Sequence, residues 1–421
     1  MKSQVPYVPP MEELERLKYL YAQFIIQKAL AVCSGQRVHL LRAPRDAQSF
    51  VQLLTQLATE AGAQEVSIHW ENEEDRLEAL DSHSFSKIIT AQNWIADLAA
   101  RPLTKDAFII FDCVCSGIFD HSDEKSVLDL IYVENQGMAP LWRQLSINAA
   151  KWTMITVPTD HWARRRYPKV DLREGKLLLW KDIFARCRIS LSDPVFQQWE
   201  RHIHYLEGKA AQLNNIRFSR LRLLSAGTDI TVALAQGHRW RGPVFVTPGG
   251  EHFIPNIPMN EIFTAPHRSD VTGIVRSVRP VVVNGIEIDG IELVFSAGRV
   301  ISARAEKGDG PLQLILKSDE GSSRLGEIAL VPRATTVTTS AIPIFYSTLF
   351  DENAGSHLAL GRAYRVSIEP ILEDQEFLAA GGNLSNIHID FTVDDGSLTV
   401  EGFSKNGEKD LIFYNGKWVL P

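Results

Sequence analysis

The pattern of apolar residues changes around residue 240, and no other feature of this 421-residue chain limits its fold as strongly. Before that point, short continuous apolar runs alternate with segments in which apolar residues recur at helical spacing. The predicted strands are 37–41, 65–70, 107–111 and 152–157, and the predicted helices are 11–33 and 46–61. Such alternation is typical of helices packed over a largely parallel sheet. We therefore predict an N-terminal α/β domain over residues 1–240.

After residue 240 the turn signals become dense and the predicted strands become shorter. Asn284-Gly285 separates two short strand-like segments, and Asn415-Gly416 separates the last two apolar runs of the chain. Both residues of an Asn-Gly pair tolerate positive φ angles, so each pair indicates a β-hairpin. Further strands are predicted over 291–295 and 300–305. We therefore predict a second domain over residues 241–421, with a β-rich α+β fold.

Charge, hydropathy and cysteine content argue against several classes of protein. The net charge of -7 argues against a nucleic-acid partner, which normally requires a basic surface. No apolar run reaches the length of a membrane span, and the N-terminal segment lacks the apolar core of a signal peptide. Four cysteines are too few for a disulfide framework, and we expect Cys113 and Cys115 to be buried thiols. These features together predict a cytoplasmic protein that does not associate with membranes.

The C-terminal half contains carboxylates and histidines of the types that bind divalent metals. His388 and Asp390 lie two residues apart in a predicted strand, so their side chains project from the same face. Glu327 leads into an apolar run, where a buried carboxylate is costly unless it is paired or metal-bound; a surface position is the alternative. Glu261 and His357 fit helix-start or capping roles equally well, and we predict a helix after His357. Taken singly, none of these residues identifies a metal site.

Several blocks of sequence resemble one known family, in the same order along the chain. They are 227–232, 237–240, 256–258, 261–266, 303–308, 319–321, 324–327 and 348–361, with Tyr364 shortly after the last. The longest block reads Thr-Leu-Phe-Asp-Glu-Asn-Ala-Gly-Ser-His-Leu-Ala-Leu-Gly. These blocks resemble the thermophilic-type metallo-aminopeptidases, the family of aminopeptidase T, aminopeptidase S and PepS. The resemblance covers roughly the C-terminal half, which it implies is the metal-binding catalytic domain.

The resemblance implies a hydrolase that uses two divalent metal ions, either zinc, cobalt or manganese. In that family the ions are held by two glutamates, two histidines and an aspartate. Those roles fall on residues of the matching types: Glu261, Glu327, His357, His388 and Asp390. The implied substrates are peptides with leucine or another apolar residue at the N-terminus, and a homodimer is implied in the same way.

Two residues acquire catalytic roles from this resemblance. The family's tyrosine falls on Tyr364, which would help to stabilise the negative charge that develops on the attacked carbonyl oxygen. It follows His357 by two helical turns if the intervening segment is helical, so both side chains would then share a face. Glu327, besides holding metal, would carry the proton from the attacking water to the leaving amine.

A different reaction is the main alternative. His357, His388 and Asp390 alone form the two-histidine, one-carboxylate set of mononuclear non-heme iron oxygenases. Ring-cleaving dioxygenases of the dihydroxypyridine type resemble the same family in fold. A mononuclear site requires neither Glu261 nor Glu327, whereas a dinuclear site requires both, so their presence favours the peptidase. A non-catalytic protein on the same scaffold is a third interpretation, which the complete ligand set disfavours.

Overall fold

The first half of the chain forms a four-stranded parallel sheet in a computed structural model that describes residues 11–71, 73–112, 119, 122–283, 285–332 and 344–420. The strands are β1 (Arg37–Ala43), β2 (Glu65–Trp70), β3 (Asp106–Phe111) and β4 (Lys151–Ile155), in the order β2-β1-β3-β4. Each pairing between neighbours is parallel. β3 is buried along its whole length, as expected for an inner strand covered on both faces. The predicted parallel sheet is therefore confirmed.

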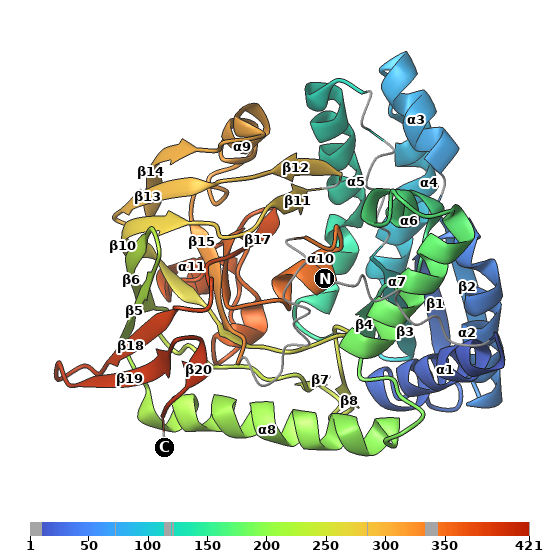
Figure 1. Cartoon of the computed structure of the whole chain (residues 1–421), viewed down its shortest axis with the longest axis horizontal. Helices are drawn as coiled ribbons and strands as arrows, with labels where there is room; N and C mark the ends of the chain where they lie inside the picture. The colour runs from blue at the N-terminus through green and yellow to red at the C-terminus, as the bar shows by residue number, and fades with distance from the viewer. Residues whose placement is uncertain are drawn as a thin grey trace, which may run out of the picture.

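Helices surround this sheet, and Figure 1 shows them on one side of the molecule in blue to green. They are α1 (Met11–Phe24), α2 (Gln48–Glu60), α3 (Glu73–Ser82), α4 (Ser86–Ala99), α5 (Glu124–Leu145), α6 (Asp160–Arg166), α7 (Leu172–Arg186) and α8 (Val195–Ile216). The helix predicted over 11–33 continues from α1 into a π-helical turn, Ile25–Ala29, and ends there. α8 runs along the lower edge of Figure 1, beneath the strands of the second half.

An eight-stranded antiparallel sheet dominates the second half, in the order β14-β13-β10-β6-β5-β18-β19-β20. Its strands are β5 (Arg220–Ser225), β6 (Thr228–Leu234), β10 (Pro266–Arg276), β13 (Glu292–Ser296), β14 (Arg299–Arg304), β18 (Thr399–Phe403), β19 (Lys409–Tyr414) and β20 (Lys417–Trp418). β19 and β20 pair across Asn415-Gly416, so the predicted terminal hairpin is confirmed. β11 (Val281–Val283) also pairs with β12 (Ile286–Ile288), although the turn residue Asn284 lies outside the described residues.

A smaller antiparallel sheet, ordered β17-β16-β15-β9, contacts the large one between β15 and β10 and carries the residues of interest. Its strands are β9 (Ile262–Thr264), β15 (Leu325–Leu330), β16 (His357–Gly361) and β17 (His388–Thr392). The remaining helices are α9 (Asp309–Ile315), α10 (Thr348–Glu352) and α11 (Asp374–Ala379), and β7 (Phe245–Val246) pairs with β8 (His252–Phe253). β15 and β16 are buried along their whole length, which the apolar residues of both strands permit.

The helix predicted after His357 is wrong, because this segment is the strand β16. Leu358, Ala359 and Leu360 are buried and pair with β15 on one side and β17 on the other. A run of a few apolar residues has no periodicity that separates a buried strand from a buried helix. Here the hydrogen-bonding partners on both sides determine the strand, and those partners are distant in sequence.

The change from a parallel to an antiparallel sheet occurs earlier along the chain than the change in the pattern of apolar residues. The antiparallel sheet begins with β5 at Arg220, directly after α8, whereas the predicted domain boundary lies at 240/241. The division into residues 1–240 and 241–421 remains a proposal. Among the described helices, none is long and apolar enough to cross a membrane. Cys113 and Cys115 lie outside the described residues, and Cys33 and Cys187 are free thiols.

Candidate metal centre

The five predicted ligand residues come together on one face of the small antiparallel sheet. Glu261 immediately precedes β9, Glu327 lies within β15 and His357 begins β16. His388 and Asp390 lie on β17, two residues apart, so the predicted shared face is confirmed. The register explains the convergence, since Ala329 of β15 pairs with His357 and Ala359 of β16 pairs with Asp390. Residues two apart on one strand project from the same face, which brings all five side chains to one place.

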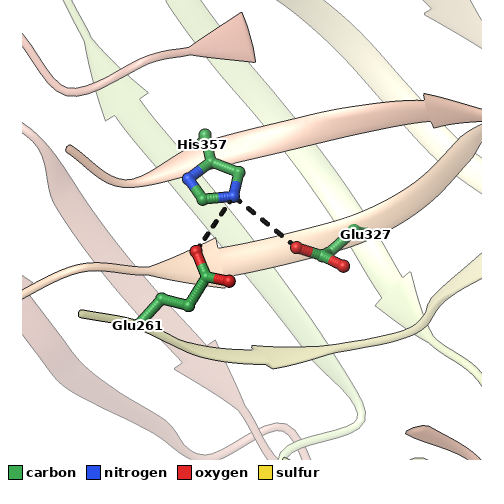
Figure 2. Close-up of side chains that lie close together, drawn as sticks. All are labelled: Glu261, Glu327 and His357. Carbon is green, nitrogen blue, oxygen red and sulfur yellow. Dashed lines mark ion pairs between the residues drawn. The ribbon is translucent and has the colours of Figure 1, made fainter. Parts of the chain in front are cut away.

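One group of potential ligands consists of Glu261, Glu327 and His357 (Figure 2). The Nε2 atom of His357 lies 3.2 Å from Oε2 of Glu261 and 3.5 Å from Oε1 of Glu327. The three residues are between 1% and 4% exposed, so bulk water cannot solvate these charges. Burying two carboxylates beside one histidine is costly unless a cation is also present.

The second group consists of Glu327, His388 and Asp390, so Glu327 belongs to both. The Nε2 atom of His388 lies 3.8 Å from Oε2 of Glu327 and 3.4 Å from Oδ1 of Asp390. Asp390 Oδ1 is also 3.7 Å from Nε2 of His357, which places it between the two histidines. The two oxygens of Glu327 therefore face two different histidines.

Backbone carbonyls fix the orientation of both imidazole rings. Nδ1 of His357 lies 3.1 Å from the carbonyl oxygen of Gly355, and Nδ1 of His388 lies 2.7 Å from that of Arg362. A carbonyl oxygen only accepts, so Nδ1 carries the proton in each ring. Nε2 is therefore the atom that faces the carboxylates, and once it loses its proton its lone pair could bind a metal, which is the usual arrangement for histidines that bind metal.

The cluster holds more carboxylates than its two histidines can neutralise. The pKa of Glu261 is raised to about 8, chiefly by burial, with the charges of Glu327 and Asp390 adding to the shift and His357 opposing it. Burial lowers the pKa of His357, but Glu261, Glu327 and Asp390 outweigh it and raise the pKa to about 10. Among the described residues, Glu261 Oε2 and Asp390 Oδ1 are buried without a hydrogen-bond partner. Divalent cations would neutralise these oxygens, so the residues fit a metal site.

Glu352, at the end of α10, is a further acid at the cluster, partly buried, that the sequence analysis did not single out. Its side chain is hydrogen-bonded to Asp390, and its Oε1 accepts from the side-chain amides of Asn353 at 3.2 Å and Asn256 at 3.4 Å. Burial raises the pKa of Glu352, and the charges of Asp390, Glu261 and Glu327 raise it further. The available signal was its place five residues before His357 in the longest family-like block.

Tyr364 also lies at the cluster, although not through the helix that we predicted. It follows β16 and precedes a short 3-10 turn, Arg365–Ser367. Its ring packs edge-on against the ring of His388, with centroids 5.0 Å apart, and against Phe263 at 5.7 Å. Burial raises the pKa of Tyr364, and the nearby charge of Glu327 raises it further, so its hydroxyl stays protonated and can donate.

A small cavity adjoins the ligands on the side of Tyr364. Its volume of about 20 Å³ is room for roughly one water molecule. Apolar side chains from both halves of the chain form its outer wall, among them Trp152, Phe245 and Met259. Glu261, Glu327, Glu352, His388 and Asp390 form the inner wall. A mainly apolar lining with a few polar groups on one side is the usual composition of a site that binds small molecules.

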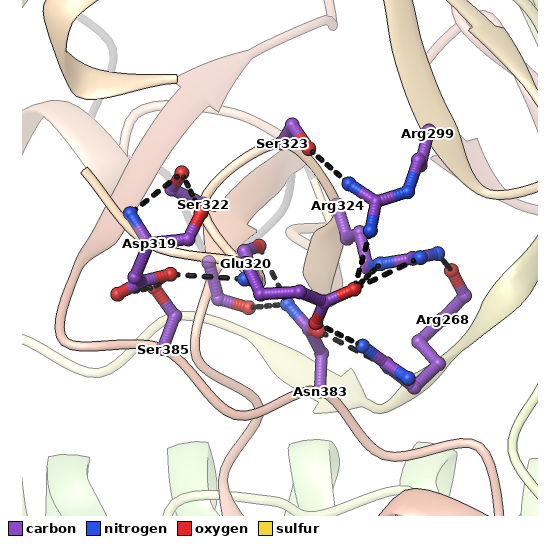
Figure 3. Close-up of polar contacts among 11 residues, drawn as sticks. Arg268, Arg299, Asp319, Glu320, Ser322, Ser323, Arg324, Asn383 and Ser385 are labelled. Carbon is purple, nitrogen blue, oxygen red and sulfur yellow. Dashed lines mark hydrogen bonds and ion pairs between the residues drawn. The ribbon is translucent and has the colours of Figure 1, made fainter. Parts of the chain in front are cut away.

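A polar network behind the sheet holds the strands that carry the ligands (Figure 3). The side-chain amide of Asn383 is fully buried and donates to the carbonyl oxygens of Gly321, at 2.8 Å, and Gly361, at 2.7 Å. Gly321 precedes β15 and Gly361 ends β16. Asp319 accepts hydrogen bonds from the hydroxyl of Ser385 and the backbone N–H of Asn386, just before β17. Three ligand-bearing strands are thus connected through one buried amide and one carboxylate.

We expect Asn383→Ala to lower both the stability of the protein and its affinity for metal, although Asn383 is not itself a ligand. The substitution removes the side-chain donor from both carbonyls, although the N–H of Arg324 still donates to that of Gly321 at 3.1 Å, so we expect a total cost of roughly 1–3 kcal/mol in the free energy of unfolding. Displacing groups that orient metal ligands typically lowers metal affinity by about 10- to 100-fold. Urea unfolding and metal titration of the purified variant would measure the two effects. Asn386→Ala is the matched control, because Asn386 is exposed and only its backbone joins the network. Equal behaviour of the two variants would contradict this role for Asn383.

Comparisons with known proteins agree with this geometry. A family model described as Thermophilic metalloprotease (M29) matches residues 14–418. The chain is 33% identical to aminopeptidase T of Thermus thermophilus, covering 97% of this chain and 100% of that protein. It is 31% identical to aminopeptidase AmpS of Bacillus subtilis, with coverage of 97% and 100%. The solved structure of wild-type AmpT from Thermus thermophilus superimposes with a TM-score of 0.85 at 30% identity, covering 97% of this chain and 100% of that one. These matches give no support to the dioxygenase alternative.

Proposed function

This chain belongs to the thermophilic metalloprotease (M29) family and is a metallo-aminopeptidase, and from that premise we propose that it acts with two divalent metal ions. We propose further that it releases single N-terminal residues from peptides, with a preference for leucine or for apolar residues broadly. Zinc, cobalt and manganese each suit the mixed set of carboxylate and imidazole ligands. A cytoplasmic location and a homodimer remain proposals of the same kind; light scattering of the purified protein tests the dimer.

The observation that carries the dinuclear proposal is the position of Glu327. It is the one residue that belongs to both ligand groups, and its two oxygens face different histidines. Glu261 and His357 would complete one site, while His388 and Asp390 would complete the other. Because a mononuclear site of two histidines and one carboxylate leaves Glu261 and Glu327 buried without a charge partner, the dinuclear arrangement accounts better for the cluster.

The residues around the cluster have distinct tasks in peptide hydrolysis. Two bound divalent ions would supply a hydroxide nucleophile at neutral pH and polarise the scissile carbonyl. Glu327 is committed to holding the ions, so we assign the proton transfer to Glu352, which contacts Asp390 and belongs to neither ligand group. Its carboxylate would take a proton on the cluster side and pass it to the departing amine. Tyr364 would donate a hydrogen bond from its hydroxyl to the developing oxyanion, and the apolar wall would exclude bulk water.

Metal content and activity measured together test this proposal. Purified protein reloaded with zinc, cobalt or manganese is expected to hold about two ions per chain and to hydrolyse leucyl-p-nitroanilide. Chelation is expected to reduce the rate to below about one hundredth, since the ions provide the nucleophile, and reloading should restore it. Full activity with a single ion per chain would contradict the dinuclear proposal. Release of other residues but not of leucine would contradict only the proposed preference.

A further inference from the structure

A second and larger cavity also adjoins the metal centre. Its volume is about 150 Å³. Pro280 and the strand β11 make one side of it, and Thr348 of α10 and Thr392 of β17 make two others. Figure 1 shows the β11–β12 hairpin close to α10 and β17, in agreement with the packing of β11 against β17. Asp351 and Ile389 complete the lining, together with three residues of the cluster, Glu352, His388 and Asp390.

The same three residues also line the small cavity, so the ligand cluster separates two spaces of different size. The small cavity holds roughly one water, whereas an apolar cavity of about 150 Å³ is known to hold a benzene molecule. A side chain the size of leucine therefore fits only the larger cavity. A cavity of this size cannot contain a departing peptide of arbitrary length. Its volume suits one side chain next to the scissile bond.

Val282 is the residue of the hairpin best placed to limit this space. Side chains alternate along a strand, and Val281 and Val283 pack against the core of the second half. Val282 therefore projects from the opposite face of β11, where it is partly exposed and lines the cavity. All three valines of β11 border the cavity, but Val281 and Val283 also pack against the core, which leaves Val282 as the one that faces only the cavity side.

The hairpin that carries Val282 is held on several sides. The N–H of Val278, just before β11, donates to the carbonyl of Thr392 in β17 at 2.9 Å. In β12, Glu287 pairs with Arg165 of α6 at 3.2 Å and with Lys307 at 2.9 Å. Contacts with both halves of the chain fix the distance between Val282 and the ligands. A wall held in this way can discriminate between side chains by size.

We propose that this cavity is the subsite for the side chain of the substrate's N-terminal residue, and that Val282 sets the largest aliphatic residue accepted. The proposal rests on the proposed function, because it requires that peptides are cleaved at the ligand cluster. The ligand class is an uncharged side chain from alanine to leucine in size. Larger aromatic residues are excluded by the γ-methyl groups of Val282.

Substitutions of opposite size at one position test the subsite. Val282→Phe fills the cavity, and kcat/KM for leucyl-p-nitroanilide is expected to fall at least about tenfold while that for alanyl-p-nitroanilide changes by less than about twofold. Val282→Ala enlarges it, and the ratio of kcat/KM for phenylalanyl- to leucyl-p-nitroanilide is expected to rise about tenfold. Val419→Ala makes the same change at an exposed position near the C-terminus and should alter neither ratio. Metal content should equal that of the wild type in all three variants.

A second substrate series distinguishes failure of the subsite assignment from failure of the proposed function. Leucyl dipeptides that differ only in the second residue should keep their relative rates in both Val282 variants. If the variants instead change the preference for the second residue, or lower every rate equally, the subsite assignment is wrong while the proposed function stands. If the wild-type protein loaded with metal releases no N-terminal residue from any of these substrates, the proposed function fails and the subsite fails with it. Should Val282→Phe not fold, Val282→Ala alone decides the assignment.

Discussion

Glutamine in place of Glu327 is expected to lower kcat/KM for leucyl-p-nitroanilide by about 10³-fold or more and to leave about one ion per chain. The substitution preserves the shape of the side chain but replaces one ligand oxygen by an NH₂ group, which cannot bind a cation. Because the two oxygens of Glu327 face different histidines, one of the two ligand groups loses a member whichever way the amide is oriented. Losing the chemistry of one ion costs several kcal/mol of transition-state stabilisation, and each tenfold in rate is about 1.4 kcal/mol.

Elemental analysis and steady-state kinetics on the same preparation would measure this result. Glu408→Gln is the matched control, since Glu408 is exposed in the loop before β19 and its side chain is remote from the ligand groups. That variant should retain wild-type activity and metal content. If Glu327→Gln also kept full activity with unchanged metal content, the dinuclear assignment would be wrong.

Glu352→Gln is expected to separate proton transfer from metal binding. Glu352 belongs to neither ligand group, so the variant should still hold about two ions per chain. Glutamine cannot accept or release a proton, and general acid–base catalysis contributes about 10² to 10⁴-fold, so we expect kcat to fall by about 10³-fold with KM little changed. The pH dependence of the remaining rate should lose the limb that belongs to this carboxyl group. Titration of metal content and a pH profile of kcat would measure both.

Loss of metal in the Glu352→Gln variant would assign Glu352 a different role. If Glu352→Gln lost an ion together with its activity, Glu352 would be a ligand and another group would have to move the proton. Glu352→Asp provides a second comparison, because it keeps the carboxyl group but withdraws it by one methylene. Under the proton-transfer assignment it should recover part of the rate lost in the glutamine variant, at unchanged metal content.

The sequence predicted the strands and hairpins well where periodicity and turn chemistry are local. The strand predicted at 65–70 matches β2 (Glu65–Trp70), and Asn415-Gly416 does join β19 to β20. Prediction failed at His357–Gly361, where five residues are too few to show a period. What makes that segment a strand is pairing with β15 and β17, whose residues lie about thirty positions away on either side.

In the candidate site, too, contacts between residues close in sequence could be predicted, whereas contacts between distant segments could not. The shared face of His388 and Asp390 followed from strand geometry alone. Bringing Glu261 and Glu327 to His357 required the register of three strands, which only the family resemblance supplied beforehand. Glu352 was missed because an acidic pair in a short helix normally faces water, and only the packing of α10 against β17 places it at the cluster. The dual position of Glu327 is likewise visible only in three dimensions.

The ligands are spread across four neighbouring strands. The amount of metal that the protein binds therefore depends on whether these strands have paired in the correct register. Slipping any one of these strands by a single residue would turn its ligand to the opposite face. Each ligand group needs at least three strands in register, and both groups need β15, which carries Glu327, so no short peptide from the chain could offer a complete group. Ions that bind the finished sheet and not the unfolded chain draw the folding equilibrium towards the native register, by about 4 kcal/mol at a thousandfold excess over the dissociation constant. For the wild-type chain, metal stoichiometry after reloading therefore becomes a measure of folding yield.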